Sequence, residues 1–314
     1  MDPQKQVIPA AAIIPTMNRA PVLTRTLESL FQQDTLPESI IIVDASPGDE
    51  TKNALEALRV PPGVSITYAR ATIKGAAHQR SQALSLTNLP YVVFMDDDVI
   101  LEPECVRRVY LGFSPIDSGV TNVGGVNAMI TNQRYTKPGF VTKTMYRLMD
   151  RNRATWAGLV IGPAWNLLPE DDPQLPAYVK CEWLNLGCTM YRRDVLPIPL
   201  FPETFSGYSL FEDLTLSLKI GKTSTLLNAR TAQLFHDSQP GDYKRDVSKI
   251  AEMEFYNRYF VMTKVLGRTG FVNYWKFFVF QWFGIVSGFI SSRSLTLLFA
   301  NIRGKIRALK MIIR

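Results

Sequence analysis

YVVFMDDDVI, residues 91–100, joins five consecutive apolar residues directly to three aspartates. An apolar run of this length predicts a strand buried on both faces, as in a parallel sheet. IIIVDASPGD, residues 40–49, has the same order, and its expected strand ends at Asp44. Ligands of open α/β sheets bind at the carboxyl ends of the strands. We therefore expect Asp44 and Asp96–Asp98 to face one crevice, although they lie far apart in the sequence.

Strand and helix patterns alternate around these two stretches. Apolar runs predict strands, and apolar residues at helical spacing, such as Leu23, Leu27 and Leu30, predict helices. The expected strands cover residues 7–14, 40–43, 64–68 and 91–95, and the expected helices follow Asn18 and cover residues 49–58 and 76–86. This alternation predicts an α/β, Rossmann-like fold, in which helices flank a mainly parallel sheet.

The second half of the chain is less regular. Residues 119–202 are rich in Trp, Gly and Pro, residues 212–222 predict a helix, and residues 226–235 predict one or two short strands. The composition changes after a turn at Pro240-Gly241. Beyond it we expect a long helix over residues 243–266, an aromatic, apolar segment over 271–290 and a basic amphipathic end, NIRGKIRALKMIIR. These changes predict a main domain over residues 1–240 and a helical region over 241–314.

Composition narrows the class of protein. Hydrophobic residues make up 46% of the 314 residues and charged residues 20%, which excludes a disordered chain. The formal net charge of +7 favours an anionic partner: a nucleotide, a nucleic acid or an acidic membrane surface. Nucleic acid is not expected, because the basic residues are spread along the chain before the tail and no known binding motif occurs.

Cysteine and histidine usage also excludes some sites. The three cysteines form no tight pairing motif and are expected to be reduced thiols of a cytosolic protein. His78 and His236 are the two histidines, too few for a zinc site of standard Cys/His spacing, and His78 is expected to be structural. The N-terminal stretch lacks a basic leader and a cleavage site, so no secretory signal is expected.

Asp96, Asp97 and Asp98 are the clearest candidate site. Three adjacent carboxylates repel one another unless a cation neutralises them, and oxygen ligands suit Mg²⁺ or Mn²⁺. A cation held by few carboxylates usually completes its shell with substrate phosphates. A solvated acidic turn is the alternative, and the triplet alone leaves both open.

Six stretches, found in order along the chain, resemble glycosyltransferase family 2, whose catalytic domain has the GT-A fold. They are IIPTMNRAPVLTRTLESL, IIIVDASPGD, KGAAHQRSQAL, YVVFMDDDVI, LNLGCTMYRRDVL and LFEDLTLSLKIGK. The resemblance covers roughly residues 7–240, with a nucleotide-sugar half at about 7–130 and an acceptor half at about 131–240. It implies an inverting enzyme that moves a sugar from a nucleoside-diphosphate sugar to a hydroxyl of a glycan or lipid-linked acceptor, with Mg²⁺ or Mn²⁺ as cofactor.

The resemblance assigns donor-binding roles to residues of the first four stretches. The nucleotide-sugar contacts would be Pro15, Thr16, Arg19, Asp44, Lys74, Gly75, Arg80, Asp96 and Asp97. Asp44 matches the aspartate that binds the base, and Asp96 matches the acid that contacts the ribose. Alternatively, Asp44 caps the turn that follows it, and Arg80 is a solvated helix residue.

Metal and catalytic roles follow from the same resemblance. Asp98 would be a metal ligand, His236 after the last expected strand a second one, and Asp213 the general base that takes the acceptor's proton. Donor-sugar and acceptor contacts would be Trp183, Gly187 and Glu212. The alternatives are a structural histidine, first-turn acids that favour the helix dipole and a core tryptophan. Phe211 departs from the pattern, because Gly is common before the Glu-Asp pair.

The C-terminal region predicts membrane attachment. Phe277–Ser292 contains no charged residue, and basic residues dominate the amphipathic tail behind it. This combination is typical of a segment that binds an anionic membrane surface, here on the cytoplasmic side of the cell membrane. We expect a peripheral attachment ahead of a single spanning anchor. A buried helix or a dimer interface is the alternative.

Two other functions compete with glycosyl transfer. A sugar-phosphate nucleotidyltransferase shares the strand-end acids and the metal, but it usually has a glycine-rich, basic loop after the first strand. This chain has Pro15-Thr16-Met17-Asn18-Arg19 there. A non-catalytic membrane-bound scaffold would keep the fold, and loss of Asp98 or Asp213 would have favoured it. Both residues are present.

Overall fold

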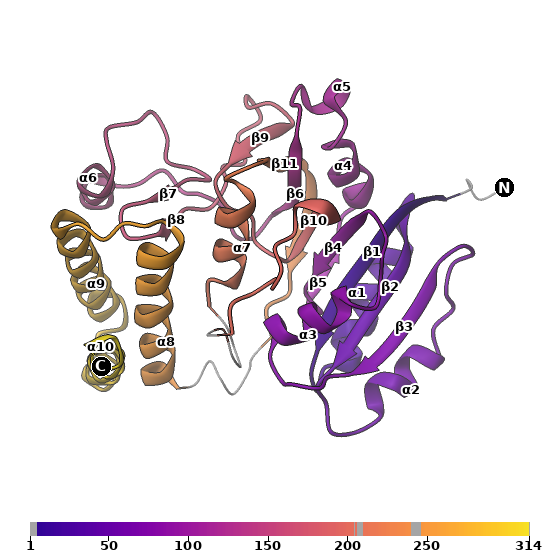
Figure 1. Ribbon diagram of the computed structural model, residues 1–314, viewed down its shortest axis with the longest axis horizontal. Helices are drawn as coiled ribbons and strands as arrows, with labels where there is room; N and C mark the ends of the chain where they lie inside the picture. Colours follow the sequence, from indigo (N-terminus) through magenta and orange to yellow (C-terminus); the bar gives the residue numbers. More distant parts are fainter. Residues whose placement is uncertain (1–4, 204, 206–209, 240–245, 314) are drawn as a thin grey trace.

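The computed structural model describes residues 5–203, 205, 210–239 and 246–313. Four parallel strands form its N-terminal half, in the order β3 (Ser65–Arg70), β2 (Thr35–Asp44), β1 (Gln6–Thr16) and β4 (Tyr91–Met95) (Figure 1). Residues Ala10–Ile14 of β1 are fully buried, which explains their unbroken apolar sequence. The register pairs Thr16 with Asp44, so β1 and β2 end at the same edge of the sheet.

The second half continues the same sheet through strands of both directions. Beyond β4 lie β10 (Cys188–Arg192), β6 (Val123–Ile130), β11 (Thr225–His236) and β5 (Val99–Leu101), and β9 (Tyr178–Cys181) also pairs with β11. β6 and β11 run with the N-terminal strands, whereas β5, β9 and β10 run against them. The sheet is therefore mainly parallel, as the sequence predicts. The expected strand over residues 226–235 is one strand with an irregularity between Ala229 and Gln233.

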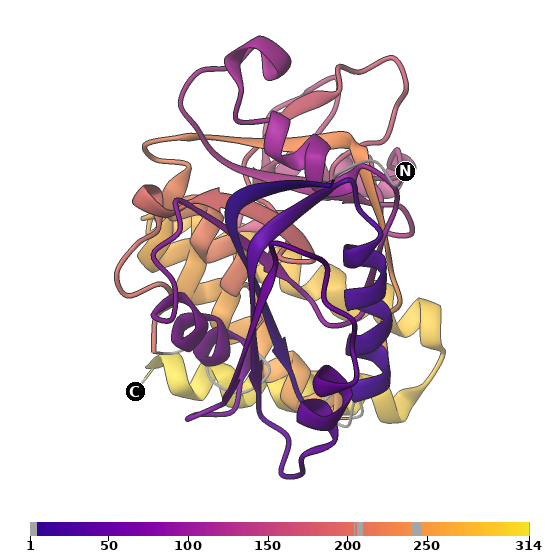
Figure 2. The same ribbon diagram turned by 90° about the vertical axis from the view of Figure 1, so that its right-hand side faces the viewer.

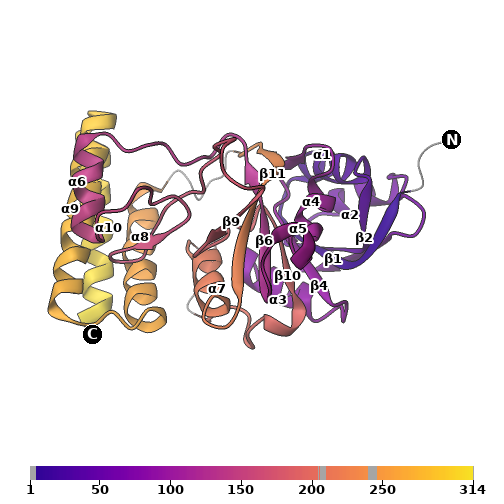
Figure 3. The ribbon, with the colours of Figure 1, turned by 90° about the horizontal axis from the view of Figure 1, so that it is seen from above.

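Helices cover both faces of this sheet. α1 (Ala20–Phe31), α2 (Glu50–Glu56) and α4 (Cys105–Leu111) pack on one face, and α3 (Ala76–Leu84) and α7 (Glu212–Ile220) pack on the other (Figures 2 and 3). Leu23, Leu27 and Leu30, whose spacing predicts α1, are buried against the sheet. A short helix, α5 (Pro115–Ser118), and a 3₁₀ turn, η1 (Arg193–Val195), complete this part.

An irregular segment between β6 and β9 packs against the C-terminal helices, where Trp165 contacts Phe280. It contains α6 (Phe140–Met149) and a small hairpin formed by β7 (Val160–Ile161) and β8 (Trp165–Asn166). Tyr146 of α6 meets Trp156 and Trp165 edge to face, with ring centroids 5.5 and 4.8 Å apart. These aromatic contacts bury the Trp-rich sequence that has no regular pattern.

The chain ends in three helices that lie together at the far end of the molecule from the N-terminus (Figures 1 and 3). They are α8 (Val247–Phe260), which continues into the π-helical turn η3 (Val261–Val265), α9 (Phe271–Ser292) and α10 (Leu295–Ile313). Phe277 of α9 packs on Phe255 of α8 at 4.8 Å. Gly304 lets α10 cross α8 closely, because a Cβ there would lie 2.1 Å from the Ser248 carbonyl oxygen.

The helix expected over residues 243–266 begins later than expected, and its last turn is π-helical. It begins at Val247, because the Asp246 side chain accepts a capping hydrogen bond from Lys249 N at 2.9 Å. It ends in η3, where Leu266 N bonds Val261 O at 3.0 Å. The expected turn at Pro240-Gly241, the domain boundary there, the chain's first four residues and Arg314 lie outside the described residues. Among the described helices, none has both the length and the hydropathy needed to traverse a bilayer.

Candidate active site

A cavity of about 460 Å³ opens at the carboxyl ends of β1 and β4. Segments far apart in the sequence meet there: the end of β1, Asp96–Asp98, Trp183–Gly187, the start of α7 and the end of β11. The residues assigned a role by sequence line this cavity, except for Asp44, Lys74 and Gly75. The acidic triplet is therefore no solvated turn, because Asp97 and Asp98 are buried.

Asp97 anchors the loop after β1. Its carboxylate accepts hydrogen bonds from Thr16 Oγ1 at 2.7 Å and Arg19 Nη1 at 3.0 Å. Thr26 of α1 donates to the Asp97 carbonyl oxygen at 2.8 Å. Burial raises the pKa of Asp97 to about 6, and the Thr16 hydrogen bond opposes that rise. Asp97 thus holds Thr16 and Arg19 at the cavity wall.

Asp96, Asp98 and His236 form a cluster in which one ligand atom from each lies within 4.8 Å of the others. His236 Nε2 lies 2.9 Å from Asp98 Oδ1. Burial raises the pKa of Asp98, but the interactions with His236, Gln239 N and Arg19 together outweigh burial, so the net shift is downward. Two carboxylates and an imidazole suit a divalent cation such as Mn²⁺. The sequence-based choice of Asp98 and His236 as ligands fits this cluster, and Asp96 joins them.

The Gln133 side chain contacts the ring nitrogen of His236 that does not face Asp98. Its Nε2 lies 2.9 Å from His236 Nδ1. With its amide turned, Gln133 would accept a hydrogen bond from Nδ1–H of His236 through its Oε1 and leave the Nε2 lone pair for a metal. Sequence reasoning misses Gln133, because it lies in the irregular segment after β6, about 100 residues before His236. The pairing of β6 with β11 brings the two together.

Arg80 connects the acidic cluster to α7. Its guanidinium bonds Asp96 at 2.6 Å and also Glu212 Oε1, and its side chain is only 4% exposed. It is therefore not the solvated helix residue of the alternative interpretation. Buried Arg80 neutralises two carboxylates that would otherwise repel each other across the cavity.

Asp213 is the next residue of α7 and lies outside this ion-pair network. Its Oδ1 accepts a hydrogen bond from Leu214 N at 2.7 Å. Burial raises the pKa of Asp213 to about 6, while Leu214 N and Arg80 oppose the rise. A carboxylate whose pKa lies near neutrality is suited to take a proton from a bound hydroxyl.

Trp183 and Gly187 also line the cavity. The Trp183 ring is buried, and its Nε1 donates to Leu167 O at 2.7 Å, so the ring has a fixed orientation. Gly187 O accepts a hydrogen bond from Asp96 N at 3.2 Å.

Gln79, also missed by sequence reasoning, donates to Thr16 O and Val43 O at 2.9 and 2.7 Å. It ties α3 to the ends of β1 and β2.

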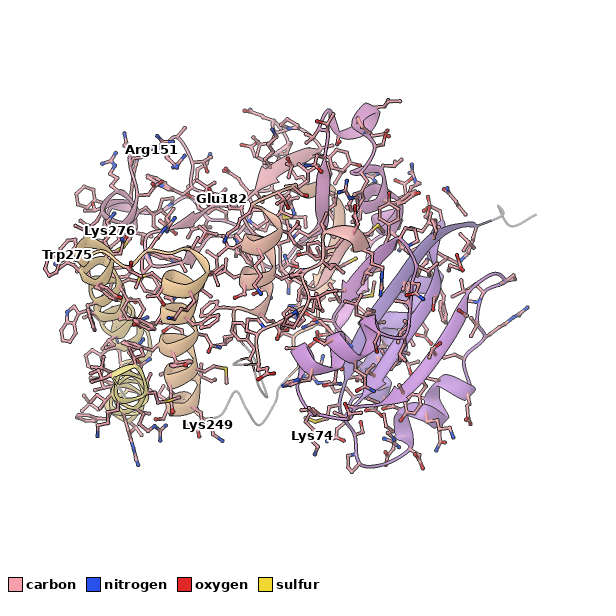
Figure 4. The ribbon with its side chains drawn as sticks, in the orientation of Figure 1. Lys74, Arg151, Glu182, Lys249, Trp275 and Lys276 are labelled. Carbon is pink, nitrogen blue, oxygen red and sulfur yellow. The ribbon has the colours of Figure 1, made fainter. Side chains whose placement is uncertain are left out.

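Asp44 does not face the cavity, contrary to the expectation for the strand ends. It is fully buried and bonds Ser46, Tyr68 at 3.1 Å and Arg70 at 3.3 Å. Lys74 is an exposed surface residue on the loop before α3 (Figure 4). Gly75 has a φ of +131°, which favours glycine and explains its presence there. A role for these three residues in donor binding stays a prediction.

Phe211 has a φ of +70°, which is unusual for a residue with a side chain. This left-handed conformation explains why glycine suits the position. Its ring lies 4.5 Å from the Arg258 guanidinium, which is also 4.5 Å from the Phe280 ring of α9. Arg258 is buried and bonds Ala164 O and Glu254. The start of α7 is thereby linked to the C-terminal helices.

Solved structures share this fold. A mannosyltransferase from Pyrobaculum calidifontis, in complex with GDP-Man and Mn²⁺, matches with a TM-score of 0.57 and 14% identity, over 98% of this chain and 88% of that one. GalNAc-T7 with UDP, GalNAc and Mn²⁺ matches with a TM-score of 0.52 and 15% identity, over 72% of this chain and 43% of that one. The fold is thus that of the GT-A glycosyltransferases.

Sequence comparison supplies the family. The model of Glycosyl transferase family 2 matches residues 11–196, more than half of the chain. The protein therefore belongs to glycosyltransferase family 2. A validoxylamine A glucosyltransferase from Streptomyces hygroscopicus subsp. limoneus is 27% identical over 101 residues, which are 32% of this chain and 22% of that protein. The match therefore spans about a fifth of that relative's length.

Proposed function

We propose that the protein is an inverting glycosyltransferase that moves a sugar from a nucleoside-diphosphate sugar to a hydroxyl of a glycan or lipid-linked acceptor. The observation that carries this proposal is the separation of carboxylates in one cavity. Asp96 and Asp98 cluster with His236, whereas Asp213 lies apart from them on α7. A direct displacement needs both a site that binds the diphosphate and a separate base for the acceptor.

Asp96, Asp98 and His236 would hold a Mn²⁺ or Mg²⁺ ion, which would neutralise the charge of the leaving diphosphate. Arg19 and Arg80 fix the acidic residues around it by ion pairs. Asp213 accepts the proton of the acceptor hydroxyl as the sugar is transferred, and the anomeric configuration inverts in this single displacement. Buried Trp183 forms an apolar wall that excludes water from one side.

The donor is identified by its effect on thermal stability. A ligand that binds only the folded protein raises the melting temperature by mass action. We expect nucleoside diphosphates of one base, added with Mn²⁺, to raise it, and the same nucleotides with EDTA to have little effect. A panel of GDP, UDP, ADP and their sugars, each measured in both conditions, gives the base and the sugar. If no nucleotide shifts the melting temperature with Mn²⁺, the proposed donor site is wrong.

The place of action, we propose, is an anionic membrane surface on the cytoplasmic side of the cell membrane, where polysaccharide or glycolipid is made. α9 exposes one apolar side, which includes Phe271, Trp275, Phe278 and Trp282, and Trp282 is 67% exposed. A contiguous apolar surface of this kind usually marks an interaction site. α6 lies beside α9 and adds exposed Phe140 and the basic residues Lys143 and Arg147 (Figure 3).

Two charges on the apolar side of α9 test this membrane attachment. The variant Trp275→Glu/Trp282→Glu should no longer sediment with anionic vesicles. Anionic headgroups repel carboxylates, and burying a carboxylate in the membrane surface costs free energy because it loses its water. Both side chains are at least 45% exposed, so folding should be unchanged. Ile116→Glu on α5, at 96% exposure and distant from α9 in Figure 1, is the matched control and should sediment normally. Wild-type protein that stays in the supernatant would contradict the proposal.

A further inference from the structure

A second cavity, of about 390 Å³, lies at the end of the molecule formed by α6 and α9. It is lined by the C-terminal end of α6, β7, Glu182 after β9, the loop around Arg268 and the first turns of α9. Figure 4 shows Arg151, Lys276 and Trp275 gathered at this end. Trp275 is exposed, whereas Lys276 is partly buried in the cavity wall.

Cations outnumber anions in this cavity. The charged residues that line it are Arg151, Arg153, Arg268, Lys276, Asp150 and Glu182. Asp150 is paired with Arg153, and Glu182 accepts a hydrogen bond from Val160 N at 2.6 Å. Among the described residues, the other three cations form no ion pair with a carboxylate. Arg268 and Lys276 instead donate to the carbonyl oxygens of Gly162 and Met149.

Such an arrangement leaves positive charge without a full counter-charge. Burial lowers the pKa of Arg268, although Glu182 and Asp150 act in the opposite direction. A cavity lined by several donors and unbalanced cations suits a group with several anionic oxygens, such as a phosphate. Three guanidinium groups and an ammonium can together supply more hydrogen bonds than one phosphate accepts.

The neighbouring surface indicates what carries the phosphate. Asn273 and Lys276 of α9 line the cavity, and Phe271, Val272 and Trp275 of the same turns are exposed. A ligand with an anionic head and an apolar tail would match both surfaces at once. We propose that the cavity binds the phosphate group of an anionic membrane lipid, whose acyl chains lie along the exposed apolar side of α9.

This lipid site borders the active site. Val160, Ile161 and Gly162 line the second cavity, and Asn166 of the same hairpin lines the active-site cavity. Glu182 also lines the second cavity, and the next residue, Trp183, lines the active-site cavity. One bound lipid would therefore fix the distance of the active site from the membrane, without taking part in the chemistry.

The test uses a lipid that needs no bilayer. Dihexanoyl phosphatidic acid, kept below its critical micelle concentration, should bind the full chain in calorimetry at least tenfold more tightly than inorganic phosphate. Dihexanoyl phosphatidylcholine should not bind measurably, because its choline cation would meet Arg268 and Lys276. Failure of vesicle binding alone would count against the membrane proposal and not against this site, because the probe is soluble.

Charge-removing variants locate the site. Arg151→Gln and Lys276→Gln should each weaken phosphatidic acid binding by about tenfold, the usual effect of losing a charge-assisted hydrogen bond. Lys276→Arg keeps the charge and should keep most of the affinity, which separates binding from damage to the fold. Lys249 is exposed near the N-terminal end of α8, away from the second cavity (Figure 4). Lys249→Gln is therefore the matched control and should bind phosphatidic acid normally.

Three results would overturn the proposal. Absence of binding to phosphatidic acid excludes a phosphate site. Equal affinity for inorganic phosphate and phosphatidic acid would make free phosphate the ligand and exclude the lipid. Unchanged affinity in both glutamine variants, at unchanged melting temperature, would place any bound lipid outside this cavity.

Discussion

Replacing Asp98 with asparagine is expected to abolish Mn²⁺ binding and, with it, metal-dependent binding of the nucleoside diphosphate. Asp98 contacts both His236 at 2.9 Å and Arg19 at 3.2 Å. The amide keeps the size of the side chain but removes the charge that a cation requires. Transfer should fall by on the order of 10³ or more, because metal stabilisation of a leaving group contributes several kcal/mol.

Calorimetry with Mn²⁺ and a transfer assay check this prediction. Asp237→Asn is the matched control: it makes the same chemical change one residue after His236, at a carboxylate that pairs with Arg25 at 2.7 Å. It should bind Mn²⁺ normally. Gln133→Ala should weaken Mn²⁺ binding by roughly 10- to 100-fold, because it removes only the group that orients His236. Undiminished transfer in excess EDTA would disprove the metal assignment.

Replacing Asp213 with asparagine should lower turnover by on the order of 10² to 10⁴ and leave donor affinity almost unchanged. The acceptor's proton then has no carboxylate to receive it, whereas the metal cluster and Arg80 are untouched. In the wild type, turnover should rise as the pH increases through about 6, because the base works only when deprotonated and burial raises its pKa to that value. The variant should lack this rise.

The pH dependence of thermal stability gives an independent measure of the pKa of Asp213. A carboxyl whose pKa is raised from 3.8 to about 6 binds more protons in the folded protein than in the unfolded one. Its contribution to stability therefore falls as the pH rises between those values. Asp213→Asn should melt at a higher temperature than wild type at pH 8, and the gain should shrink toward pH 4.

Glu212→Gln is the comparison variant for Asp213→Asn. It removes a counter-charge of Arg80, which also bonds Asp96 at 2.6 Å, so donor binding should weaken.

Near-normal turnover of Asp213→Asn would place the base elsewhere and remove the main support for an inverting displacement.

The N-terminal half of the fold could be predicted from the sequence because its signals are local. The strand that ends at Met95, directly before Asp96, is an unbroken apolar run, and an apolar run over residues 40–43 forms the last part of the strand that ends at Asp44. α7 begins at Glu212 as expected. The second half depends on contacts between distant segments. The pairing of β6 with β11 joins residues about 100 positions apart, and short stretches such as β7 and β8 have no periodicity to detect.

The candidate site likewise combines residues that local sequence motifs predict with residues whose position depends on distant contacts. Asp96, Asp98 and Asp213 follow recognisable motifs, and they line one cavity. Sequence could not reveal that Asp44 is enclosed by Ser46, Tyr68 and Arg70, because its burial depends on side chains from β3. Nor could it reveal Gln133, whose importance comes only from its position behind His236.

The stacking of Arg258 between Phe211 and Phe280 has a thermodynamic consequence. One ring precedes α7 and the other belongs to α9, so a displacement of α9 at a membrane would change the environment of both. If the membrane alters donor affinity by some factor, reciprocity requires that the donor alter membrane affinity by the same factor. Enzyme saturated with donor and enzyme without it would then partition differently between bilayer and water, and the ratio of their partition coefficients would equal that factor.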